Sequence, residues 1–318
     1  MRQYPWYQEQ WETLFHDLER FPHALIIHAQ DNAVCDDFAQ NLCHALLCQN
    51  RLADDACGAC DNCLWVNNHS HPDFFSVDEE GNETTDKLIP VKVIRSLKNF
   101  FELTSHQSHG KKIAYIARAH RMNKESSNAL LKIVEEPPND CLIILSTSQL
   151  DAIIPTVKSR SRLVHLHQPV QEDGLAYLHT LNLDMDASTL AFFGNSPVAA
   201  INERDTFAHA KSIVRALSEG EALNPDAIKN DWLDYGLAWL VTVMQKWIYD
   251  LLLFKLTQEI SYFPGEKSAL KKLAGQSSLP NMLVFQKKLN EIKAYASKPV
   301  NKEINMEVMM MEYRKMFR

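Results

Sequence analysis

The first 167 residues alternate continuous apolar runs with segments in which apolar residues recur every three or four positions. A short continuous run is typical of a strand buried on both faces, and the wider spacing is typical of a helix. Strands are expected at 23–29, 73–78, 112–117, 141–147 and 162–167. Helices are expected at 34–47, 91–103 and 124–135. This alternation predicts an α/β domain whose mostly parallel sheet is covered by helices on both faces.

Beyond Pro169 the spacing of apolar residues is helical throughout. It predicts a small helical unit at 170–204, interrupted near Gly194, and a larger helical region after it. Three domains are therefore expected, at 1–167, 168–205 and 206–318.

The most apolar stretch of the chain, at 236–256, contains Lys246 and Asp250 four positions apart. Two charged groups on one side of a helix would be costly at the centre of a bilayer. We therefore interpret this stretch as a long core helix. The first twenty residues contain Arg2, Glu9 and several other charged residues, which argues against a signal peptide and for a cytosolic protein.

Charge restricts the possible partners. The 318 residues carry a net charge of −7, which argues against a protein that grips nucleic acid over its whole surface. From 255 to 318, however, twelve Lys or Arg face six Glu, so this region is basic. It predicts either solvated helix faces or a surface for a polyanion or a protein partner.

Four cysteines form the strongest chemical signal: Cys48, Cys57, Cys60 and Cys63, spaced C-x8-C-x2-C-x2-C. Clustered thiols in a cytosolic protein favour a metal over disulfides. Two C-x2-C steps present several thiolates to one ion, and a fourth cysteine completes a tetrahedral, closed Zn²⁺ site, which is structural and not catalytic. The same spacing also begins the motif of a cubane iron–sulfur cluster.

Two histidines that follow this cluster are alternative ligands. His69 and His71 could substitute for a cysteine, although the sequence after His71 leads into a predicted strand. The remaining cysteines, Cys35, Cys43 and Cys141, lie in apolar or helical settings and are interpreted as buried thiols.

A nucleotide-binding loop is expected after the first strand of such a domain, but its residues are missing. The segment 29–36 has the place and length of G-x-x-x-x-G-K-[ST], yet Gly58 is the first glycine of the chain. Cys35 occupies the lysine position and Asp36 the hydroxyl position that would bind magnesium. After the third strand, Ala117–Arg118 stands where acidic residues would hold the metal. Taken alone, these four positions indicate only that the domain is not a nucleotidase; together with the family resemblance of the following motifs they imply a degenerate nucleotide site.

Several sequence motifs, and the order in which they occur, resemble those of the AAA+ clamp-loader family. Within this family they resemble the delta-prime subunits of the bacterial DNA polymerase III clamp loader. They are Tyr-Pro-Trp at 4–6, His-Pro-Asp at 71–73, the run Asn123–Pro138, Leu-Ser-Thr at 145–147 and Thr156–Arg162. The resemblance covers most of the first 170 residues and, beyond them, rests on domain order and length.

The resemblance implies an AAA+ P-loop-like domain with an inserted zinc loop at 48–63, then a small helical lid and an all-α C-terminal collar. In that family the collar joins the delta-prime subunit to delta and to three tau/gamma ATPases in a heteropentamer. ATP binding lets the complex open the sliding clamp and load it on primer-template DNA. The resemblance implies a cytoplasmic, replisome-associated subunit that hydrolyses no ATP itself.

The resemblance also implies that one residue of this chain takes part in catalysis at the ATP site of a neighbouring subunit. Family members hold a Ser-Arg-Cys motif whose Arg reaches the ATP site of a neighbouring tau/gamma subunit, and here it corresponds to Ser159-Arg160-Ser161. The planar, permanently charged guanidinium of Arg160 suits a γ-phosphate. Ser161 departs from the family's Cys. An ordinary surface Arg is the alternative, with Lys158 and Arg162 as rival cations.

Two other functions are less consistent with the sequence. An active AAA+ ATPase of the tau/gamma type is opposed by the residues missing around Cys35 and Ala117. The lid segment at 196–198 also lacks the Arg with which a motor senses nucleotide. A zinc-dependent DNA-binding module is opposed by the acidic residues that outnumber Arg51 in the cysteine loop.

Overall fold

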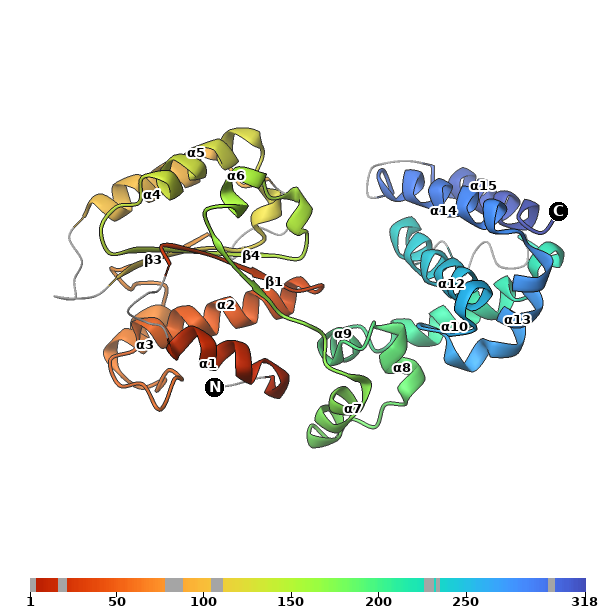
Figure 1. Ribbon diagram of the computed structural model, residues 1–318, viewed down its shortest axis with the longest axis horizontal. Coiled ribbons are helices and arrows are strands. Elements are labelled where there is room, and N and C mark those ends of the chain that lie inside the picture. The colour runs from red at the N-terminus through yellow and green to blue at the C-terminus, as the bar shows by residue number, and fades with distance from the viewer. Residues whose placement is uncertain are drawn as a thin grey trace. The chain divides into compact units, whose positions relative to one another are not determined.

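A computed structural model describes residues 4–16, 22–77, 88–103, 111–225, 232, 235–296 and 301–318 (Figure 1). The chain divides into two compact units, residues 1–168 and residues 169–318. Each unit is described by itself.

The first unit is built on a five-stranded sheet in the order β2-β3-β4-β1-β5, and every neighbouring pair is parallel. The strands are β1 (Ala24–His28), β2 (Phe74–Val77), β3 (Lys112–Ile116), β4 (Cys141–Thr147) and β5 (Arg162–His165). All five predicted strands are confirmed, although β5 ends two residues before the predicted boundary, and Asp78 lies outside the described residues. Strands β1, β3 and β4 are almost wholly buried, which explains their continuous apolar runs.

Helices cover both faces of this sheet. Figure 1 shows α4, α5 and α6 over one face and α1, α2 and α3 over the other. The elements are η1 (Pro5–Tyr7), α1 (Gln8–His16), α2 (Asn32–Leu47), α3 (Asp61–Asn67), α4 (Val91–Glu102), η3 (Ala119–Arg121), α5 (Lys124–Glu135), η4 (Leu150–Ala152) and α6 (Pro155–Lys158). The predicted α/β domain with a parallel sheet is therefore confirmed. Helix α5 begins where the Asn123 side chain accepts a hydrogen bond from the Ser126 N–H, and it ends just before Pro137.

The second unit is helical, as the sequence predicts. Its elements are α7 (Gln171–Thr180), α8 (Ala187–Phe192), α9 (Pro197–Asn202), α10 (Thr206–Leu217), η5 (Gly220–Ala222), α12 (Leu237–Thr257), η6 (Pro264–Glu266), α13 (Lys267–Gln276), α14 (Leu279–Lys293) and α15 (Lys302–Lys315). One hydrophobic core extends from Leu178 to Met316. The separation of 168–205 as a lid from 206–318 as a collar stays a prediction.

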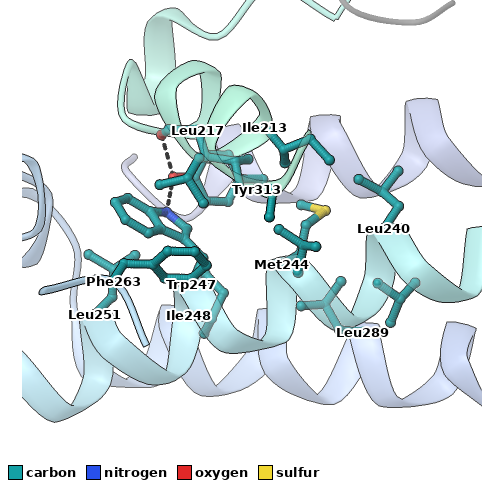
Figure 2. Close-up of a cluster of buried hydrophobic side chains, with 14 of the residues drawn as sticks. Ile213, Leu217, Leu240, Met244, Trp247, Ile248, Leu251, Phe263, Leu289 and Tyr313 are labelled. Carbon is teal, nitrogen blue, oxygen red and sulfur yellow. Dashed lines mark hydrogen bonds between the residues drawn. The ribbon is translucent and has the colours of Figure 1, made fainter. Parts of the chain in front are cut away.

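A buried polar relay lies at the centre of this core (Figure 2). The Trp247 indole N–H donates to the Tyr313 hydroxyl over 2.9 Å, and that hydroxyl donates to the Leu217 carbonyl over 2.6 Å. Trp247 and Tyr313 are both fully buried. The hydroxyl therefore satisfies two polar groups that water cannot reach, and it ties α10, α12 and α15 together.

Removing this hydroxyl should be costly for its size. We expect Tyr313→Phe to lower the free energy of unfolding by about 1–3 kcal/mol, because a buried N–H and a buried carbonyl lose their partner. Chemical denaturation followed by tryptophan fluorescence measures the change. Tyr295→Phe is the matched control, since the Tyr295 hydroxyl bonds Asn305 at a partly exposed position. A loss no larger than in the control would contradict the role of the relay.

Helix α12 is long and apolar enough to cross a membrane, but more than half of its most apolar window is buried inside the protein. Two of its charged residues, Lys246 and Asp250, are satisfied within the fold. Asp250 is fully buried and accepts hydrogen bonds from the backbone N–H groups of Ser261, Tyr262 and Phe263. Lys246 donates to the Phe192 carbonyl over 2.7 Å, and its ammonium lies 4.0 Å from the centre of the Phe192 ring. These contacts support the prediction of a core helix.

Burial should make Lys246 a source of pH-dependent stability. It lowers the pKa of Lys246 from 10.5 to about 8. Between these values the folded chain has released a proton that the unfolded chain still holds, so this residue stabilises the fold more as pH rises. From pH 7.5 to 9.5 we expect the free energy of unfolding of the wild type to rise by about 1–2 kcal/mol relative to Lys246→Met.

The comparison needs a lysine that is exposed on the same unit, and Lys267 at the start of α13 provides it. Urea unfolding of the wild type, Lys246→Met and Lys267→Met is measured at both pH values. An equal pH dependence for the two variants would contradict the contribution of Lys246.

Candidate functional site

The segment expected to form a phosphate loop is mostly helix. Strand β1 ends at His28 and α2 already begins at Asn32, two residues earlier than predicted, so only 29–31 remain as a loop. The Asp31 carboxylate accepts a hydrogen bond from the Ala33 N–H and caps the helix. The positive end of the helix, which would otherwise attract a phosphate, thus already has an anionic partner from the chain itself.

Cys35 occupies the position at which a phosphate loop has its lysine, and its side chain is buried there. Its sulfur is fully buried, accepts a hydrogen bond from the Ala29 N–H over 3.0 Å and lies 3.3 Å from the Thr147 carbonyl oxygen. Burial raises the pKa of the Cys35 thiol to about 12, so the group is neutral. It closes the space between β1, α2 and β4 and supplies no charge for a phosphate.

Asp36, at the position of the magnesium-binding hydroxyl, is the centre of a polar network. Its carboxylate lies 3.3 Å from Nε of Arg118 and accepts hydrogen bonds from the hydroxyls of Tyr115 and Ser146. Arg118 adopts a left-handed backbone conformation, with φ of 48°, and its N–H also donates to Ser146. The structure thus brings together two residues that the sequence identified separately, Asp36 and Arg118.

Sequence reasoning missed the partners of Asp36. Tyr115 lies in the middle of β3 and carries no motif, whereas Ser146 lies near the end of β4 within the Leu-Ser-Thr motif, which gave no sign of this contact. Both side chains point to the same carboxylate only because β3 and β4 are neighbours in the sheet. The alternation of side chains along a strand predicts on which face of the sheet Tyr115 lies, but it does not predict that Tyr115 contacts Asp36.

The four cysteines lie together in the loop region between α2 and β2. Their sulfurs are all within 4.8 Å of one another, with distances of 3.9 Å from Cys48 to Cys60, 4.0 Å from Cys57 to Cys63 and 3.4 Å from Cys60 to Cys63. A tetrahedral zinc ion with bonds of about 2.3 Å requires sulfur–sulfur distances of about 3.8 Å. The four residues therefore fit one metal ion. Thiolates bound to separate irons of a cubane would lie farther apart.

Backbone amides point at these sulfurs. The Cys57 N–H donates to the Cys48 sulfur and the Cys60 N–H to the Cys57 sulfur, both over 3.3 Å. Burial opposes ionisation of Cys60, but hydrogen bonds from the backbone of Cys63 and Gln49 outweigh it and lower the pKa of this thiol to about 6. Such bonds stabilise the thiolate form, which is the form that binds a metal.

The neighbouring residues hold the loop and are not ligands. Gly58 has a φ of +72°, which favours glycine in the turn of the first C-x2-C step, between Cys57 and Cys60. Asn62 is buried and donates to the Leu47 carbonyl, which anchors α3 to the end of α2. His71 accepts a hydrogen bond from the Asp73 N–H through Nδ1 and leads into β2. Among the described residues, the four cysteines are the group of at least three potential ligands whose atoms lie close enough together to bind one metal ion.

Arg160 lies in the turn between α6 and β5 and is well exposed. Its guanidinium donates to the Thr156 carbonyl and to the Ser159 hydroxyl over 3.2 and 3.3 Å, and lies 3.1 Å from a carboxylate oxygen of Glu135. Ser159 in turn donates to the Thr156 carbonyl over 3.1 Å. Glu135, at the end of α5, is a partner that the sequence did not identify.

The segment at 196–198, predicted to belong to a lid, lies at the start of α9. Ser196 caps α9 by accepting a hydrogen bond from the Ala199 N–H, and Pro197 occupies the first turn. The segment therefore serves the helix start and presents no cation.

The fold and the site define a parallel α/β domain that carries a four-cysteine group, and known proteins resemble it. A model of the family described as "DNA polymerase III, delta subunit" matches residues 8–170. DNA polymerase III subunit delta' of Pseudomonas aeruginosa is 29% identical over 266 residues, which are 80% of this chain and 79% of the relative. Its counterpart in Escherichia coli is 30% identical over 207 residues, 63% of this chain and 60% of the relative.

A solved gamma subunit-related protein of Thermotoga maritima is 17% identical and aligns with 97% of this chain and 100% of its own, at a TM-score of 0.43. The family match spans just over half of the chain. The chain therefore belongs to the family of DNA polymerase III delta-prime subunits, and the resemblance seen in its sequence is confirmed.

Proposed function

We propose that this chain is the non-hydrolysing delta-prime subunit of a clamp loader and lends Arg160 to the ATP site of a neighbouring tau/gamma subunit. The observation that carries the proposal is the ion pair between Asp36 and Arg118. It occupies the positions where a working ATPase keeps its magnesium ligands. Hydrolysis needs a metal to neutralise charge on the transferred phosphoryl group, and here a guanidinium already neutralises the only carboxylate of this network.

Arg160 is the group that this chain can offer a neighbour. A finger must be exposed, permanently charged and able to form a forked contact with phosphate. Arg160 meets these requirements, and its partners Thr156 and Ser159 hold the side chain at the surface of the turn. The rivals Lys158 and Arg162 are half-buried.

Zinc is the metal proposed for the four cysteines. All four ligands come from the protein, so the site is closed and the ion stabilises the loop. The distances between the sulfurs support a single ion.

The C-terminal helix offers a surface for assembly. On α15 the buried residues are Met306, Met309, Met310 and Tyr313. Ile304, Val308 and Met311 are exposed, with 57% of Ile304 and 56% of Met311 accessible. Their spacing of four and three residues places them on one face of the helix. An exposed apolar row of this kind supports the predicted collar contact with tau/gamma and delta, and through that complex the action on clamp and primer-template DNA in the cytosol.

We expect the double substitution Ile304→Glu and Val308→Glu to abolish co-purification with tau/gamma and delta chains, because two carboxylates would be buried without partners at the interface. The unfolding temperature of the isolated variant should be unchanged, since both positions are exposed. Leu181→Glu, at an exposed apolar position beyond α7, is the control. Normal assembly of the double variant would show that α15 does not form the contact.

The function as a whole is tested by co-expression with candidate tau/gamma and delta chains. The expected result is a stable complex whose ATP turnover requires the other subunits, while the purified chain alone hydrolyses no ATP. Turnover by the isolated chain would contradict the proposal and support the active ATPase.

A further inference from the structure

A second group of metal-ligating side chains lies at the carboxyl edge of the sheet, apart from the four cysteines. His28 is the last residue of β1 and His165 the last residue of β5, and they are direct neighbours in the parallel register. The Leu166 N–H donates to the His28 carbonyl over 2.7 Å, so the pairing of the two strands continues past both histidines. The backbone therefore holds the two imidazoles side by side on a rigid element.

In each of the two rings, Nδ1 is the nitrogen that faces the other ring. Nδ1 of His28 lies 3.3 Å from Nδ1 of His165. Two imidazoles on one tetrahedral zinc ion, each with a bond of about 2.0–2.1 Å, have nitrogens about 3.3–3.4 Å apart. A third imidazole is adjacent, because the ring of His167 lies 4.3 Å from that of His165, centre to centre.

The surroundings of His28 match those of a metal ligand. Its ring also forms a hydrogen bond with the backbone of Ser148, just after β4. Ligating histidines commonly donate their second ring N–H to a backbone carbonyl, which fixes the tautomer and leaves the other nitrogen free for the metal.

From this geometry we infer that the chain binds a late first-row divalent cation, of the class of Zn²⁺ and Ni²⁺, through Nδ1 of His28 and Nδ1 of His165. Water is available for the remaining positions. Imidazole ligands suit these ions, whereas the thiolates of the cysteine cluster provide a separate and tighter site. The inference does not depend on the proposed role in clamp loading.

The test uses the full chain after loading with zinc, whose content is measured first. Ni²⁺ is then titrated by isothermal calorimetry. The expected result is one Ni²⁺ site that His28→Ala and His165→Ala each weaken at least about 10-fold, because each removes a ligand. His179→Ala, at an exposed histidine of α7, is the matched control and should leave the affinity unchanged.

Circular dichroism of each variant checks the fold, and His165→Asn provides a second, smaller change at the same exposed position. If Ni²⁺ binding is absent, or if it is unaffected by the substitutions at His28 and His165, the two rings share only a hydrogen bond and the site does not exist. Equal weakening by the control variant would overturn the inference as well.

Discussion

Arg160→Ala is expected to slow ATP hydrolysis at the neighbouring tau/gamma site by about 10³-fold or more, the size of effect that arginine fingers have in other nucleotidases. The guanidinium would stabilise charge that develops on the γ-phosphate, and alanine cannot replace it. The measurement is single-turnover hydrolysis by the reconstituted complex on primed DNA, which separates the affected site from the others. Assembly of the complex should be intact, because Arg160 is exposed and its contacts are local.

Three further variants make this test specific. Arg160→Lys keeps the charge but loses the planar fork, so it should recover only part of the rate. Lys158→Ala and Arg162→Ala remove the rival cations and should leave hydrolysis nearly unchanged. An unaltered rate in Arg160→Ala would rule out the finger, and a large loss in Arg162→Ala would transfer the role to that residue.

Loss of metal from the four-cysteine site is expected to have the second large effect. The ion would close the loop from Cys48 to Cys63, and a cross-link over a loop of about this length contributes about 3 kcal/mol. Chelation, or the substitution Cys57→Ser, should therefore lower the unfolding temperature of the first unit by about 6–12 °C. Calorimetry measures this shift, and elemental analysis should find about one zinc per chain before chelation.

Cys141→Ser controls for the loss of a thiol as such, since Cys141 is buried in β4 and outside the cluster. It should retain the full zinc content. Iron with visible absorbance, in place of zinc, would reject the assignment of the metal. An unfolding temperature that is insensitive to chelation would reject its structural role.

The sequence predicted much of the fold because the signals involved are local. Buried parallel strands and amphipathic helices have different periods, so all five strands and the main helices of the first unit could be located. The start of α2 was less accurate, since the cap formed by Asp31 moves it forward to Asn32.

For the candidate sites, too, the sequence predicted contacts between nearby residues and missed contacts between distant ones. The four cysteines lie within sixteen residues, so their spacing alone predicted that they meet. Arg160 was selected through a motif of three residues, but its contact with Glu135 joins the end of α5 to the turn after α6 and has no local signal. Tyr115 and Ser146 were missed for the same reason.

Residue order therefore determined the elements, the cysteine group and the loss of the phosphate loop, because each depends on residues that are near one another along the chain. Tertiary structure alone decided that Arg118 neutralises Asp36, that Tyr313 joins Trp247 to Leu217, and that His28 meets His165. Those partners are 82, 66 and 137 positions apart or more, and only the order of strands and the packing of helices bring them within hydrogen-bond distance.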